Sequence, residues 1–169
     1  MNRNILEPHL SKIKELSAEI IINVPNGDTK TTIFRADLAG LLVVAAVSTY
    51  EACVKDILIN YANAHHPAFG SFATNNFAKL NSRITIGDLN SYAKLCDNNI
   101  HESFKNDLKL HKDKINQKIG KDITKSYEQM LSWRHDFAHA WIRNTTVEEA
   151  MITHTLAKRV IYSFSAAFC

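Results

Sequence analysis

The chain has 169 residues and a mass of 19.1 kDa, with 46% hydrophobic and 22% charged residues. This composition predicts a single globular domain over residues 1–169 and argues against a disordered chain. The net charge of +3 is compatible with nucleic-acid binding but is too small to indicate it alone. Cys53, Cys96 and Cys169 are far apart and include no C-x-x-C pair, so the sequence indicates neither a disulfide framework nor a cysteine zinc site.

The most apolar segment, residues 38–47, is shorter than the roughly 20 residues that a membrane-spanning helix needs. The N-terminus lacks the apolar stretch of a signal peptide. We therefore expect a cytoplasmic protein without a membrane partner.

Helical periodicity dominates the chain and strand alternation is nearly absent, which predicts an all-α fold. A first helix is expected over about Asn4–Asn23, followed by a turn at residues 25–28. A long apolar helix is expected over about Arg35–Ala64, where it should form the centre of a helical bundle. Pro67 should follow the end of this helix, because the residue before a proline avoids the α region.

The rest of the chain predicts five shorter helical regions. Residues 67–84 should form short helical turns over the bundle, and a capping box at 85–88 predicts a helix that ends near Cys96. A further helix is expected over about Ile100–Ile119. The next should begin after Asp122 and run to about Trp141, and a threonine at 145 or 146 should start the last helix.

Arg134, His135 and His139 lie near the end of the predicted helix after Asp122 and form an Arg-x4-His motif. An arginine is always charged and can hold a phosphate through two parallel hydrogen bonds, while a histidine can transfer a proton near neutral pH. These are the groups that RNA cleavage without a metal requires. Arg134 also interrupts an apolar helical stripe, where a buried charge would need a partner. The other members of that stripe are Ile123, Tyr127, Met130, Phe137 and Trp141.

Glu51 interrupts a second apolar seam, which lies in the predicted long helix and contains Val44, Val47, Val54 and Leu58. Burying Glu51 or Arg134 alone would cost several kcal/mol, whereas pairing them would offset much of that cost. The sequence thus predicts that Glu51 contacts Arg134 or the imidazoles of His135 and His139 and fixes their orientation. The alternative is that Glu51 pairs with Lys55 on a partly exposed face.

The Arg-x4-His motif, late in an all-α chain whose long second helix reads STYEACVK over residues 48–55, resembles the HEPN superfamily, most closely its RiboL-PSP branch. The resemblance covers about residues 35–168. It implies a HEPN-like bundle that forms a homodimer, with two copies of Arg134 and His139 facing each other in a cleft. It also implies a metal-independent endoribonuclease. Many such proteins are toxins or antiviral RNases, some with an antitoxin or regulatory partner, and other members only bind.

The implied reaction needs no cofactor and no metal. The RNA 2′-hydroxyl attacks the adjacent phosphate, leaving a 2′,3′-cyclic phosphate and a 5′-hydroxyl. His139 would act as general base or acid, and Arg134 would neutralise the phosphate oxygens. His135 and Asp136 would tune or position these two groups. The rival hypothesis is a non-catalytic helical module that binds RNA, a nucleotide or a partner protein through the same cleft.

Further alternatives concern single residues. His139 could be an exposed helix residue and Arg134 a structural ion-pair member. His135 and His139 also form an H-x-x-x-H pair, for which His154 is the only loose candidate third zinc ligand. Finally, five residues subtend about 140° on an ideal helix, so either the helix distorts after Phe137 or a dimer completes the site.

A run of lysines lies along the predicted helix at 100–119 and the start of the next helix. Such a run more often marks a solvated face than a path for RNA, although contacts with phosphates remain an alternative. Arg83 and Arg143 are additional candidates for phosphate contacts. The lysines are Lys105, Lys109, Lys112, Lys114, Lys118, Lys121 and Lys125.

Overall fold

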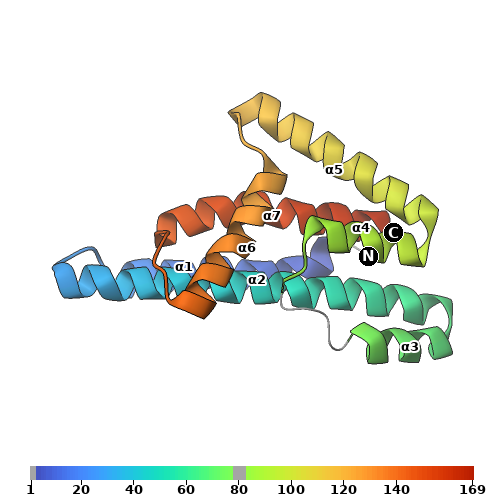
Figure 1. Ribbon diagram of the computed structural model, residues 1–169, viewed down its shortest axis with the longest axis horizontal. Helices are drawn as coiled ribbons and strands as arrows, with labels where there is room; N and C mark the ends of the chain where they lie inside the picture. Colours follow the sequence, from blue (N-terminus) through green and yellow to red (C-terminus); the bar gives the residue numbers. More distant parts are fainter. Residues whose placement is uncertain (1–2, 78–82) are drawn as a thin grey trace.

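The computed structural model describes residues 3–77 and 83–169, which form seven helices and no strand (Figure 1). The all-α prediction is confirmed. The helices are α1 (Arg3–Asn23), α2 (Thr29–His65), α3 (Pro67–Phe77), α4 (Ile86–Cys96), α5 (Asn98–Ile119), α6 (Ile123–Ala140) and α7 (Val147–Ala167).

The long helix α2 is the centre of the fold, as predicted. It has 37 residues, which corresponds to about 55 Å, and it packs against α1, α3, α6 and α7. In Figure 1 α1, α2 and α7 follow the long axis of the molecule, and α6 crosses them. By length and composition alone α2 could also cross a membrane, but a core helix has the same properties, and contact with four other helices is the role of a core helix.

Helix α2 begins at Thr29, six residues before the predicted start at Arg35. Asp28, which the sequence analysis placed in a turn, caps the helix by accepting a hydrogen bond from the Thr31 N–H at 2.8 Å. Arg35 is buried, donates to the Val24 carbonyl at 2.5 Å and forms an ion pair with Glu148. The first turns of α2 are therefore tied to the α1–α2 turn and to the start of α7.

The remaining helix ends follow the predicted signals. Thr85 and Asp88 form the capping box of α4, and the side chains of Asp122 and Thr146 cap α6 and α7. The segment predicted as short turns is one helix over its first eleven residues, 67–77, and the prediction for residues 78–82 lies outside the described part of the chain.

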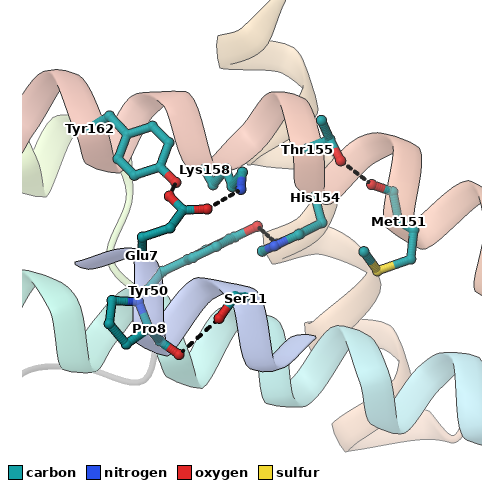
Figure 2. A network of polar contacts seen from close by, with 9 residues as sticks. All are labelled: Glu7, Pro8, Ser11, Tyr50, Met151, His154, Thr155, Lys158 and Tyr162. Carbon is teal, nitrogen blue, oxygen red and sulfur yellow. Dashed lines mark hydrogen bonds and ion pairs between the residues drawn. The ribbon is translucent and has the colours of Figure 1, made fainter. Parts of the chain in front are cut away.

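A network of polar contacts, buried at Tyr50 and His154 and partly exposed at Glu7, joins α1, α2 and α7 (Figure 2). Glu7 of α1 binds Tyr162 and lies 3.3 Å from the Lys158 ammonium, and the Tyr50 hydroxyl lies 2.7 Å from His154 Nδ1. His154 is 2% exposed, and this burial lowers its pKa to about 4. His154 is therefore a neutral core residue.

Candidate functional site

Helix α6, which carries the Arg-x4-His motif, crosses α2 where Gly40 allows a close approach. A Cβ atom at Gly40 would lie 2.1 Å from a ring carbon of Phe137, and Phe137 is buried. The aromatic ring therefore occupies the space that any other side chain at position 40 would need. This contact sets the position of α6 on α2 within three residues of both Arg134 and His139.

Helix α6 continues without a break to Ala140, so it does not distort after Phe137. It ends at Trp141, which adopts the left-handed conformation with φ of 55°. The Trp141 N–H donates to the Phe137 carbonyl at 3.0 Å, and the Ile142 N–H donates to the Asp136 carbonyl at 3.3 Å. Because the helix is regular, the angle of about 140° between Arg134 and His139 persists within one chain.

Arg134 is half-buried on α6, and its charge lowers the pKa of Glu51 on α2. Its Nε is buried and has no hydrogen-bond partner in the described part of the chain. The described residues also form no ion pair that includes Arg134, so the structural ion pair considered as an alternative is not observed. The charge of Arg134 is therefore not neutralised by a bonded acid within the described structure.

Glu51 is half-buried on α2, and its Oε1 is buried without a hydrogen-bond partner among the described residues. Burial raises the pKa of Glu51, and the charges of Arg134 and Lys55 lower it by less. No hydrogen bond or ion pair in the described structure joins Glu51 to Arg134, His135 or His139, so the predicted contact is not observed as a bond and remains a prediction. The charge of Arg134 thus reaches Glu51 across the α2–α6 crossing without a bond and partly offsets the effect of burial on the pKa of Glu51.

His135 and His139 are both exposed, and their ring centroids lie 4.6 Å apart. They are four positions apart in the sequence and so share one face of α6, which points away from Arg134. The proposed third zinc ligand, His154, belongs to the polar network of Figure 2. Within residues 3–77 and 83–169 no group of three His, Cys, Asp or Glu side chains is placed to hold a metal ion.

An exposed apolar patch that the sequence pattern does not predict lies beside the end of α6. Arg143 binds the Asp37 carboxylate at 2.5 and 3.2 Å, and both Arg143 and Trp141 lower the pKa of Asp37. Asp37 therefore lies next to Trp141, and the face of α2 that carries Asp37 lies beside the end of α6. Four exposed apolar residues surround the Asp37–Trp141 pair, and we call them the α2–α6 patch: Phe34, Leu41, Trp141 and Ile142. In the sequence, the only sign of this patch is the spacing of Phe34 and Leu41, which are seven positions apart and so share one face of α2.

The predicted basic residues separate into several environments. Lys105 pairs with Glu102 at 3.1 Å, Lys112 pairs with Asp122 at 3.1 Å, and Arg143 is held by Asp37. Arg83 is exposed, and so are the five remaining lysines of the run. The described residues form no ion pair with any of them.

Comparison with known families gives one result. The family model described as RiboL-PSP-HEPN matches residues 9–169. No curated protein and no solved structure matches the chain. Because the family model covers almost the whole sequence, including Glu51 and the Arg-x4-His motif, the chain belongs to the RiboL-PSP-HEPN family.

Proposed function

We propose that this protein is a metal-independent endoribonuclease whose site is completed by a second copy of the chain. Membership of a HEPN-type family makes an RNase-type function a reasonable starting point. The observation that carries the proposal is the state of Arg134, a half-buried guanidinium whose Nε has no partner among the described residues. A charge held this way is costly unless a ligand of opposite charge binds it, and the ligand would be the RNA phosphate.

The reaction needs two proton transfers. One histidine takes the proton of the 2′-hydroxyl while its oxygen forms a bond to phosphorus, and a second histidine gives a proton to the 5′-oxygen as the bond from phosphorus to that oxygen breaks. His139 is the first candidate for these roles, and His135 lies beside it. Arg134 would bind the oxygens on which negative charge develops. Products would carry 2′,3′-cyclic phosphate and 5′-hydroxyl ends.

The dimer is part of the proposal because one chain does not point Arg134 and His139 the same way. The α2–α6 patch lies next to the motif and exposes four large apolar side chains, the kind of surface that a partner covers. In a two-fold dimer every residue near the axis meets its own copy, so an axis through this patch would bring two motifs together. The arginine of one copy could then face the histidines of the other.

Activity is tested by incubating the purified protein with structured RNA in excess chelator. The wild type should leave cyclic-phosphate ends, and Arg134→Ala and His139→Ala should each lose at least about 100-fold, the low end for loss of an acid or base. DNA should remain intact because it lacks the nucleophile. Full activity of His139→Ala would contradict the mechanism, and binding without any cleavage by the wild type would favour the non-catalytic module.

The dimer is tested by light scattering. The wild type should have twice the 19.1 kDa mass of the chain, and Leu41→Glu should reduce it to one chain and abolish cleavage. Leu110→Glu is a matched control, because both leucines are 50% exposed and Leu110 lies on α5 outside the patch. A wild type that is monomeric at tens of micromolar yet fully active would refute the composite site.

The cellular role that we propose is that of a toxin or antiviral effector in the cytoplasm, held in check by an antitoxin or regulatory protein. Expression of the wild type in a bacterial host should slow growth and degrade RNA, while His139→Ala should do neither. A wild type that cleaves RNA in vitro but leaves growth and cellular RNA unchanged would contradict this role.

A further inference from the structure

A polar groove with a volume of about 530 Å³ lies between the α5–α6 junction, the outer side of α6 and the first turns of α7. Lys121 stands at the junction, and Lys125, Ser126 and Gln129 line the groove from α6. Thr153 contributes a hydroxyl from α7, and the largely buried Trp133 provides apolar surface. Amides, hydroxyls and ammonium groups therefore converge on one hollow.

The charge in this groove is available to a ligand. Lys121 and Lys125 are exposed, and no acid pairs with either in the described part of the chain. The groove also contains Asp122, but its carboxylate is held 3.1 Å from the Lys112 ammonium. Burial alone would raise the pKa of Asp122, but hydrogen bonds from Thr124 and Lys112 lower it to about 2.

The other acid in the groove, Glu149, accepts a hydrogen bond from the Thr145 hydroxyl at 3.3 Å. The Lys112 ammonium neutralises Asp122, whereas the neutral Thr145 hydroxyl leaves the charge of Glu149 in place. The two unpaired ammonium groups outweigh this single carboxylate, so the groove keeps a net positive charge. This arrangement favours a ligand of negative charge.

One lining residue of the groove, Lys125, lies on the same exposed side of α6 as His139. Lys125 and His139 are fourteen residues apart, which is close to four turns and about 21 Å along the helix. Ser132 lies between them near the same line on the helix surface. A strand of a few nucleotides could therefore follow the outer side of α6 from the groove to His139.

We propose that this groove binds the sugar–phosphate backbone of single-stranded RNA a few nucleotides away from the bond that is cut. Lys121 and Lys125 would contact phosphates, and Ser126, Gln129 and Thr153 would contact phosphate or ribose oxygens. The inference rests on the proposed endoribonuclease function for its biological meaning, but the binding itself does not depend on cleavage. Of the seven lysines in the basic run, only these two line the groove, and they are the two that we expect to contact RNA.

The test measures RNA binding in a protein that carries His139→Ala, so that the RNA stays intact. A fluorescently labelled single-stranded RNA is titrated, with anisotropy as the readout, over a series of salt concentrations. Lys121→Gln together with Lys125→Gln should weaken binding at least tenfold. The slope of log affinity against log salt should fall by about 1.4, because each phosphate contact to a single strand contributes about 0.7.

The matched control is Lys109→Gln together with Lys114→Gln, two exposed lysines of α5 outside the groove. It removes the same total charge and should change affinity less than threefold, without changing the slope. Equal weakening by both pairs, no weakening by the groove pair, or no RNA binding at all would overturn the proposal.

The two proposals fail separately. Wild-type cleavage in chelator with unchanged binding by the groove variant would refute the groove alone. Groove-dependent binding without cleavage would refute the catalytic proposal and support the groove.

Discussion

Replacing Gly40 with alanine tests whether the α2–α6 contact positions the motif. The new Cβ would lie 2.1 Å from a ring carbon of Phe137, whereas carbon atoms pack at about 3.5–4.0 Å, so the ring would have to retreat by about 1.5 Å. Phe137 is buried and cannot swing into solvent without losing its packing. Overpacking of this kind costs typically about 1–3 kcal/mol.

Alanine also has a higher helix propensity than glycine by roughly 1 kcal/mol, and a matched control separates this effect. Gly87 lies in α4, and a Cβ there would meet only the Thr85 hydroxyl at an ordinary 3.5 Å. Gly87→Ala should therefore be neutral or stabilising. The difference in unfolding free energy between the two variants should reach about 2 kcal/mol.

The assay combines urea denaturation, followed by circular dichroism, with RNA cleavage. Gly40→Ala should lose stability and activity together, because Phe137 lies between Arg134 and His139 on the same helix. In Gly40→Ala with Phe137→Leu, the smaller side chain should recover part of the loss, with a coupling of at least about 0.5 kcal/mol. A Gly40→Ala protein as stable and active as Gly87→Ala would show that the contact does not position α6.

Two further substitutions test the titratable groups. The pKa of His154 is about 4 in the folded chain and 6.5 in the unfolded chain, so the unfolded state binds a proton first as the pH falls. The free energy of unfolding should therefore fall by roughly 3 kcal/mol between pH 6.5 and pH 4. Urea midpoints at several pH values should show this slope in the wild type, and an equal slope in His154→Phe would refute it. Glu51→Gln should leave the fold as stable or more stable at pH 7, since burial raises the pKa of Glu51 and penalises its charged form. Its RNA cleavage should fall, and a loss of several kcal/mol in stability would instead reveal a structural ion pair.

The local signals of the sequence predicted most helix boundaries. Asp122 and Thr146 cap their helices, and the Thr85–Asp88 capping box starts α4, because a cap depends only on residues within one turn. The start of α2 was missed where Asp28 was assigned to the preceding turn. Nothing in residues 29–34 breaks a helix, so the cap decides the boundary.

The relation between Glu51 and Arg134 could not be predicted from periodicity. Each residue interrupts an apolar seam, and the seams do face each other, but the distance between two side chains on crossing helices depends on where the helices touch. The Gly40–Phe137 contact decides that point, and no pattern in either seam encodes it. Trp141 shows the same limit, because its place in the apolar stripe assumed a continuing helix, whereas the chain turns left-handed there and leaves the indole exposed.

The two residues of the Arg-x4-His motif therefore lie in different environments within one chain. Arg134 faces the α2 crossing, where its charge lowers the pKa of Glu51 by less than burial raises it, and His139 faces outward beside His135. An arginine fully paired with Glu51 would have to break that pair before it could bind a phosphate, and no such pair is present in the described structure. On a regular helix Arg134 and His139 point about 140° apart, whereas in the dimer that we propose a two-fold axis beside the α2–α6 patch would bring the arginine of one copy to the histidines of the other.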